Sequence, residues 1–453
     1  MMFSKSDLKK LLIPLIIEQF LSVLVGMLDV IMVAGAGEAA VSGVSLVDAI
    51  NLLLNQLMAA MATGGAVVAG QALGCKNRER GCRAANQLLL VTTVLALVIM
   101  ILSLTGNAVI LGGLFGKIEA DVMKNARIYF YLTAVSFPFL AIYNSCAALY
   151  RVMGNSKISM KTSLIMNGIN VAGNAIGVYV LKAGVAGVGV PTLVSRMVAA
   201  MIMLVIIRNE KNILYVDKHL RLGYDPHMIR QILSIGVPSG MENGMFQLGK
   251  IMVQSLVSTM GTTAIAGFAV AGNLVTLEYL PGTAIGMGLV TVASQCVGAK
   301  EFGQVRYYTK RFILLDYLIL AGIVLILDVF SGPIVGIYNL SPEAAAAARD
   351  LIIFHGCAMA LWPPAFLLPN ALRAASDVTF TMVVAVSSMW IFRIGLAYLF
   401  VKQFHMPVLF VWVAMSIDWI FRFFMFLWRM ASGKWQRHGS DERLKRKKKK
   451  TEA

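Results

Sequence analysis

Residues 14–37 form one continuous apolar run, PLIIEQFLSVLVGMLDVIMVAGAG, which limits how the chain can fold. A helix needs about 20 apolar residues to cross the hydrocarbon core of a bilayer, and this run is long enough. It contains two carboxylates, Glu18 and Asp29. Because an ionisable side chain inside a membrane is costly, each of them is a candidate functional residue.

Further apolar runs follow along the whole chain. The sequence is 58% hydrophobic and 14% charged, whereas soluble domains have roughly 45–50% apolar and 25% charged residues. A transmembrane β-barrel would show alternation in segments of about ten residues, which is not the pattern here. We therefore predict an all-α polytopic membrane protein with twelve transmembrane helices. The predicted segments are 9–33, 44–72, 86–112, 125–153, 158–182, 184–208, 228–257, 264–298, 309–330, 346–374, 377–401 and 406–430.

The sequence also repeats itself at a fixed shift of 224 positions. Pro14 and Glu18 return as Pro238 and Glu242, and several other residues recur at the same shift. Each half holds an even number of predicted spans, so both copies start on the same side of the membrane. We expect two parallel six-helix repeats around a central cavity. The predicted parts are an N-terminal lobe (1–207), a cytoplasmic connector (208–230), a C-terminal lobe (231–431) and a basic tail (432–453).

Lys and Arg are concentrated in alternate loops, and the turns near Gly37 and Gly261 contain none. By the positive-inside rule this pattern places both termini in the cytoplasm and makes the chain a multi-pass protein of the cytoplasmic membrane. The net charge of +17 includes the run KRKKKK at 445–450. We interpret that run as a solvated tail that sets topology and secondarily attracts anionic lipid, not as a nucleic-acid site.

Polar side chains recur on one face of three spans in the first half. At 100° per residue, Glu18 and Asp29 lie about 20° apart around their helix. Such stripes predict a water-filled cavity or an ion site, because lipid would leave the polar groups unsatisfied. The alternative is interhelical hydrogen bonding that only joins helices. The stripes comprise Glu18, Ser22 and Asp29; Asp48, Asn51 and Asn55; and Ser163, Asn167, Asn170 and Asn174.

The second half has charged residues of its own inside predicted spans. Glu242 and Lys250 share one span but lie about 12 Å apart along its axis, so we expect each to face the cavity separately. Glu18 and Glu242 are equivalent in the repeat, and we predict that they flank the inner mouth of the cavity and recruit cations. Arg393 is expected to extend to the membrane surface.

Two further groups are interpreted as structural. Asp418 and Arg422 are four residues apart and predict an ion pair. His355 is expected to be packed or hydrogen-bonded. The sequence contains no P-loop and no Ser–His or Cys–His constellation, so we expect neither an enzyme nor a cofactor.

Several segments together resemble multidrug and toxic compound extrusion (MATE) transporters. These are residues 11–45, which contain GMLDVIMVAGAGEAAVSGVS; QALG at 71–74; NVAGN at 170–174 with GVAGVGVPTLVSR at 184–196; and ALRAASDVTF at 371–380. The resemblance implies export of organic, cationic or amphipathic compounds in exchange for Na⁺ or H⁺. It also implies that Asp29, Asn170, Asn174 and Thr192 bind or relay the coupling cation, Asp29 being a metal ligand only if the ion is Na⁺.

The sequence departs from one branch of that family. This branch has a second cation site in the C-terminal half, with acidic residues at positions that Phe246 and Trp362 occupy here. Coupling through the N-terminal half is therefore favoured. We predict a cation-coupled antiporter that works as a monomer on small organic molecules. The alternatives are a flippase for lipid-linked head groups, which would need a basic cavity, and a receptor or scaffold without transport.

Overall fold

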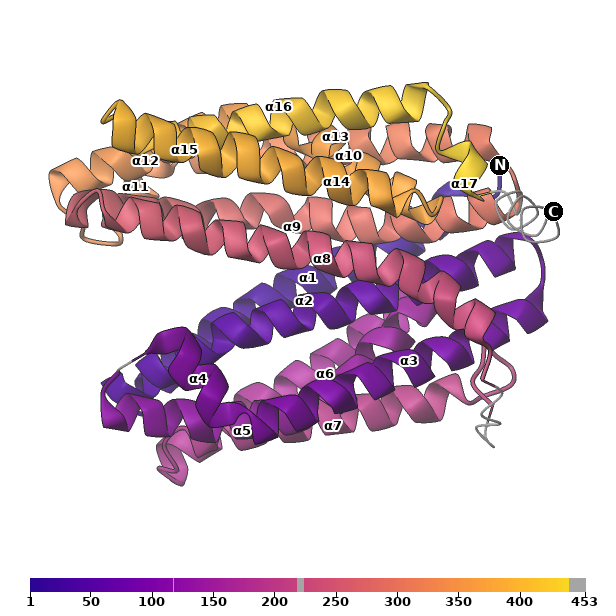
Figure 1. Cartoon of the computed structure of the whole chain (residues 1–453), viewed down its shortest axis with the longest axis horizontal. Helices are drawn as coiled ribbons and strands as arrows, with labels where there is room; N and C mark the ends of the chain where they lie inside the picture. The colour runs from indigo at the N-terminus through magenta and orange to yellow at the C-terminus, as the bar shows by residue number, and fades with distance from the viewer. Residues whose placement is uncertain (117, 218–223, 440–453) are drawn as a thin grey trace. The chain divides into compact units, whose positions relative to one another are not determined.

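The computed structural model describes residues 1–116, 118–217 and 224–439, and all the regular structure in these residues is helical (Figure 1). Most of the predicted tail, with the lysine-rich run 445–450, lies outside the described residues, as do residues 218–223 of the predicted connector. Contacts divide the chain into two compact units, Phe3–Gly240 and Met241–Ala453 with Met1–Met2. The division lies inside one helix, so residues 231–240 group with the first unit. The predicted lobes stay a prediction.

The first unit begins with a helix that has a complete N-terminal capping box. Ser4 Oγ accepts from the backbone N–H of Asp7 at 3.1 Å, and the Asp7 carboxylate accepts from Ser4 N at 2.9 Å. This satisfies two backbone donors at the helix start. The elements are α1 (Lys5–Ala34), α2 (Glu38–Gly74), α3 (Arg78–Thr105), α4 (Asn107–Phe115), α5 (Ala120–Val152), α6 (Ser156–Ala175), the π-helical η1 (Ile176–Val180), α7 (Ala186–Ile207) and the first half of α8 (Pro226–Ser258).

The second unit repeats a turn of the first. Gly37 precedes α2 with a φ of 103°, and Gly261, its partner at the 224-residue shift, precedes the next long helix with a φ of 94°. Only glycine adopts this conformation readily. The elements after α8 are α9 (Thr262–Gly298), α10 (Phe302–Val329), α11 (Ser331–Gly336), α12 (Pro342–Ala358), α13 (Trp362–Ala374), α14 (Val378–Ser388), η2 (Met389–Gly395), α15 (Leu396–Tyr398), η3 (Leu399–Gln403), α16 (Leu409–Ala431) and α17 (Gln436–Gly439).

All twelve predicted segments are helical, and the all-α polytopic architecture is confirmed. Ten described helices are long and apolar enough to cross a membrane, and α12 with α13, bent by 53°, would make an eleventh span if the pair crosses as one. The bend falls where Pro363 and Pro364 begin α13, because proline cannot continue the hydrogen-bond ladder of α12. The remaining predicted segment, 228–257, is α8, which falls short of that criterion and carries Glu242 and Lys250.

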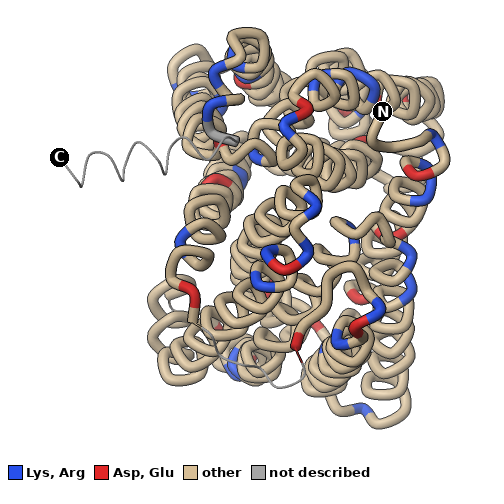
Figure 2. The backbone as a smooth tube through the Cα atoms, turned by 90° about the vertical axis from the view of Figure 1, so that its right-hand side faces the viewer, with Lys and Arg blue, Asp and Glu red and all other residues tan. Residues whose placement is uncertain are grey.

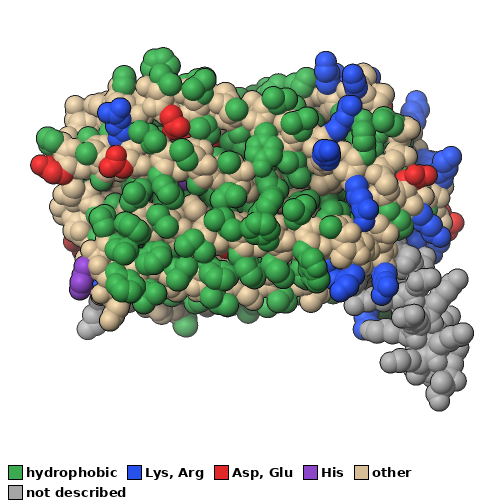
Figure 3. All heavy atoms as spheres, turned by 90° about the horizontal axis from the view of Figure 1, so that it is seen from above, with side chains coloured by type: hydrophobic (Ala, Val, Ile, Leu, Met, Phe, Trp, Pro, Cys, Tyr) green, Lys and Arg blue, Asp and Glu red, His purple; other side chains and the backbone are tan. Residues whose placement is uncertain are grey.

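The surface has the character of a membrane protein. Hydrophobic side chains cover most of the face in Figure 3, and Lys and Arg gather at one end of it. Leu318, Ile391 and Phe424 are among the exposed apolar residues of the described chain. Figure 2 shows Lys and Arg on several of the helix ends that face the viewer. This chain is a multi-pass membrane protein; which side of the membrane those ends face stays a prediction.

Candidate functional site

The first unit contains a cavity of about 290 Å³ between α1, α2, α5, α6 and α7. Its apolar lining is mostly valine. Each of the three helices with a predicted polar stripe contributes polar residues to it. The polar lining residues are Ser22, Asp29, Ser45, Asp48, Tyr129, Asn167, Asn170, Thr192, Ser195 and Arg196.

The structure brings the four predicted cation-coupling residues together at Asp29. Asn174 Nδ2 donates to Asp29 Oδ1 at 2.9 Å. The amide of Asn170 lies between Asp29 and Thr192, and the orientation that turns its nitrogen toward Asp29 suits these two neighbours. In that orientation its nitrogen donates to both Asp29 oxygens, at 3.0 and 3.2 Å, and its oxygen accepts from Thr192 Oγ1 at 3.0 Å. A carboxylate is thus surrounded by amide and hydroxyl groups at one wall of the cavity.

Close backbone packing sets the position of Thr192 relative to Asn170. Gly177 in η1 and Gly187 in α7 lie against each other, and a Cβ at Gly187 would be 2.6 Å from the carbonyl oxygen of Gly177. Real Cβ atoms do not approach an oxygen so closely, so glycine is required here. Thr192 lies further along α7 and faces Asn170.

A second carboxylate and a guanidinium share the cavity. Asn51 Nδ2 donates to Asp48 Oδ1 at 3.4 Å, and the Tyr129 side chain interacts with the Asp48 carboxylate. Arg196 Nη1 donates to Ser136 Oγ at 2.7 Å and interacts electrostatically with both carboxylates. We did not predict Tyr129 and Arg196 as site residues. Arg196 is four residues after Thr192, so helical spacing could have placed it on the same face.

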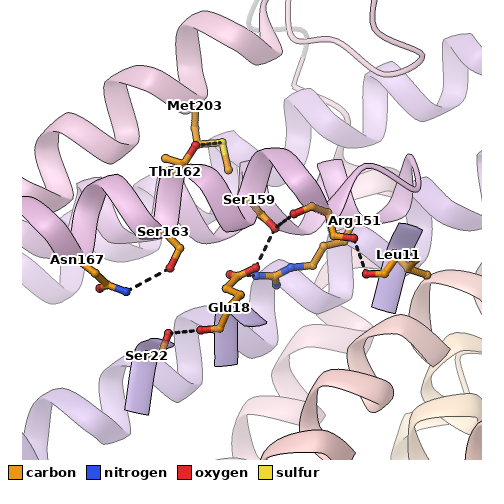
Figure 4. Close-up of polar contacts among 10 residues, drawn as sticks. Leu11, Glu18, Ser22, Arg151, Ser159, Thr162, Ser163, Asn167 and Met203 are labelled. Carbon is orange, nitrogen blue, oxygen red and sulfur yellow. Dashed lines mark hydrogen bonds and ion pairs between the residues drawn. The ribbon is translucent and has the colours of Figure 1, made fainter. Parts of the chain in front are cut away.

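Other predicted cavity residues of the first unit lie outside this cavity. Asn51 is buried behind Asp48, and Asn55 has a buried Oδ1 without a partner among the described residues. Glu18 accepts from Arg151 Nη2 at 2.8 Å and from Ser159 Oγ at 3.0 Å, and Figure 4 shows the three side chains turned toward one another. Glu18 is therefore ion-paired, not a free carboxylate.

In the second unit, Glu242 has the same kind of partner as Glu18. Arg373 Nη2 donates to Glu242 Oε1 at 2.6 Å, and Arg373 Nη1 donates to Asn370 Oδ1 at 2.9 Å. Lys250 is exposed and lies over the Phe246 ring. That Glu242 and Lys250 each face a central cavity stays a prediction.

The structural roles predicted for the Asp418–Arg422 pair and for His355 are confirmed, whereas the expectation for Arg393 is wrong. Asp418 and Arg422 form an ion pair of 2.8 Å, and His355 is fully buried and hydrogen-bonded. Arg393, expected to reach the membrane surface, is only 6% exposed. It lies 3.2 Å from Asp418, so an internal carboxylate holds it in the helix bundle.

The fold and the polar cavity between helices define a polytopic membrane transporter. A family model, MatE, matches residues 14–176 and 238–399, which is most of the chain and both halves of the repeat. This chain belongs to the multidrug and toxic compound extrusion (MATE) family of transporters, and it is not an enzyme.

Two relatives cover nearly the whole length. "Probable multidrug resistance protein YoeA" of Bacillus subtilis is 26% identical over 92% of this chain and 93% of its own. "Probable multidrug resistance protein NorM" of Thermotoga maritima is 24% identical over 97% of this chain and 96% of its own. An outward-facing MATE transporter of the MOP superfamily has a TM-score of 0.88 at 18% identity, covering 95% of this chain and 96% of that one. A MOP superfamily transporter from Pyrococcus furiosus also has a TM-score of 0.88 at 18% identity, covering 94% and 96%.

Proposed function

We propose that this protein exports organic cations or cationic amphipathic compounds across the cytoplasmic membrane in exchange for H⁺ or Na⁺ bound at Asp29. It would act as a monomer with both termini in the cytoplasm. The family supports transport, and the names of the two relatives support multidrug export.

The charge balance of the first-unit cavity is the observation that carries the proposal. Among its lining residues, Asp29 and Asp48 are the acids and Arg196 is the base. With all three ionised, one negative charge is left unbalanced. A buried unbalanced charge in a membrane is costly, so the cavity favours one additional cation.

Competition for that one charge would give exchange. A proton or Na⁺ at Asp29 neutralises the cavity and weakens the binding of a cationic substrate. Substrate in turn weakens binding of the coupling ion by the same factor, because linkage is reciprocal. The two cations would therefore occupy the cavity alternately.

The groups around Asp29 could bind either H⁺ or Na⁺. A proton would sit on the carboxylate itself. Na⁺ would use oxygen ligands, for which Asp29, Thr192 and Asn174 Oδ1 are available; that Asn174 oxygen is buried and has no partner among the described residues. Hard cations prefer such oxygens.

The test measures ethidium efflux from proteoliposomes under a pH gradient and, separately, under a Na⁺ gradient. We expect one gradient to drive efflux through the wild type and Asp29→Asn to abolish the gradient-driven part. Asp350→Asn is the matched control, since Asp350 is exposed on α12. Full gradient-driven efflux by folded Asp29→Asn protein would refute coupling at this residue.

A flippase for lipid-linked head groups is the alternative function, and one observation favours it. Lys250 and Arg393 make part of the second unit basic, as an anionic head group would require. The acidic first-unit cavity is against it. Gradient-independent movement of a fluorescent phospholipid, with no ethidium efflux under either gradient, would favour the flippase.

A further inference from the structure

Two positive side chains of the second unit lie against one aromatic ring. Lys250 Nζ is 5.4 Å from the ring centroid of Phe246, and the guanidinium carbon of Arg393 is 5.2 Å from the same centroid. Each cation is attracted to the ring. The two also repel each other, so their pairing needs a compensating negative charge.

The nearby carboxylate does not supply enough negative charge. Asp418 is 3.2 Å from Arg393 Nε but also binds Arg422 Nε at 2.8 Å. Arg422 is well satisfied, because it also donates to Ser388 Oγ and to the Ala385 carbonyl, each at 3.0 Å. One negative charge is thus shared by two arginines.

Lys250 adds to this surplus. It forms no ion pair with any carboxylate of the described residues. Lys250, Arg393 and Arg422 then carry three positive charges against the single charge of Asp418. Such an imbalance is costly within a membrane unless an anion joins the cluster.

Arg393 has donors to spare for that anion. Its side chain is 7% exposed. Nε faces the Asp418 carboxylate at 3.2 Å, but Nη2 has no hydrogen-bond partner among the described residues. Leaving buried donors unpaired is unfavourable. A guanidinium binds planar oxyanions well, because two N–H groups can point at two oxygens. Lys250 beside it is exposed and therefore reachable by a ligand.

The internal repeat supports a ligand-binding role for the same helix face. At the 224-residue shift, Phe246 and Lys250 correspond to Ser22 and Gly26. Both of these line the first-unit cavity. The second unit thus presents a cation on the face that, in the first unit, borders two carboxylates.

We propose that Lys250 and Arg393 bind an oxyanion of a transported compound, a carboxylate above all. This inference rests on the proposed export function and names its substrate class: zwitterionic amphipathic molecules, with a cationic and an anionic group. Arg393 provides the paired donors, and Lys250 provides the accessible charge.

The experiment compares two dyes that differ in one charge. Rhodamine B has a cationic ring system and a carboxylate, whereas its ethyl ester has only the cation. Binding to the purified protein in neutral detergent is followed by fluorescence polarisation. We expect the wild type to bind the acid about tenfold more tightly than the ester, as one charge-assisted hydrogen bond would give.

Substitutions at Lys250 locate the preference. Lys250→Gln should weaken binding of the acid to the level of the ester and leave the ester unchanged, while Lys250→Arg should keep the preference. Lys402→Gln is the matched control, because Lys402 is exposed and donates to Thr259 Oγ1. It should bind both dyes like the wild type.

Three results would overturn the proposal. They are equal binding of the two dyes by the wild type, binding of neither dye, and an unchanged preference in Lys250→Gln. Displacement of rhodamine B, but not of the ester, by stoichiometric phosphatidylglycerol would assign the site to a lipid phosphate and would also overturn it. No ion gradient is used, so a failure here leaves coupling at Asp29 standing, and a failure of gradient-driven efflux leaves the dye result valid.

Discussion

Arg151 on α5 holds Glu18 on α1 in an ion pair of 2.8 Å, and Ser159 on α6 donates to the second carboxylate oxygen at 3.0 Å. One side chain thereby joins three helices. Glu18→Gln keeps the shape but leaves the Arg151 charge uncompensated. We expect a loss of stability at the lower end of about 3–5 kcal/mol, because Arg151 retains some exposure. Thermal unfolding of the purified protein measures it.

Glu79 provides the control. It pairs with Arg83 at 2.9 Å, but the two side chains are 81% and 60% exposed. Glu79→Gln should change stability by less than about 1 kcal/mol, since solvent screens such pairs. Equal shifts for both variants would contradict a special role for Glu18. The double variant Glu18→Gln, Glu242→Gln tests whether these residues recruit cations. Slower transport of a cationic dye per folded molecule in that variant would support the predicted recruitment.

The contact between Gly177 and Gly187 leads to a second prediction. A methyl group at Gly177 would overlap the backbone of Gly187, so η1 and α7 would have to separate. We expect Gly177→Ala to destabilise the protein by about 1–3 kcal/mol, as overpacking does. Gly168→Ala on α6 should instead be stabilising by roughly 0.5–1 kcal/mol, because nothing lies within 4 Å of its Cβ position. Similar unfolding temperatures for the two variants would contradict this reading.

The periodicity of the sequence predicts much of the fold and part of the site. A polar stripe in a membrane helix must face inward, so the sequence predicts that Asp29, Asn170 and Asn174 share an interior. The shift of 224 residues likewise predicts that Gly37 and Gly261 occupy equivalent turns, and both have positive φ.

Partners across the bundle are harder to predict. Nothing in the sequence around Glu18 indicates Arg151, which is 133 positions away and near the end of another helix. Arg393 illustrates the same limit. Its place in the apolar run suggested extension to the membrane surface, but the fold brings Asp418 of α16 within 3.2 Å. Helix periodicity gives the face of a side chain, not the helix that it meets.

The hydrogen bond from Asn174 to Asp29 leads to a third prediction. Asn174→Leu removes the donor at 2.9 Å with little change in side-chain volume. Hydrogen bonds to charged groups contribute about 1.5–3 kcal/mol, so we expect gradient-driven ethidium efflux to fall by tenfold or more. Asn167→Leu on the same helix is the control, since Asn167 lines the cavity and donates to Ser163, at 3.5 Å. Equal loss in both variants would mean that cavity polarity matters, not the bond to Asp29.

The fourth prediction concerns a buried chain of hydrogen bonds in the second unit. His355 Nδ1 lies 2.7 Å from Glu278 Oε2, and His355 Nε2 lies 2.6 Å from Tyr279 Oη. Trp412 and Trp419 pack against the imidazole ring, so water cannot replace a lost partner.

Removing either end of this chain should therefore destabilise the protein. We expect Tyr279→Phe and Glu278→Leu each to reduce stability by about 1–3 kcal/mol, the cost of leaving a buried polar group unpaired. Tyr338→Phe serves as the control, because Tyr338 is 43% exposed. If thermal unfolding shows the same midpoint for Tyr279→Phe and Tyr338→Phe, the hydroxyl contributes nothing. If the Tyr279 variant alone unfolds earlier, the bond to His355 stabilises the packing of α12 on α9, one turn before the bend into α13.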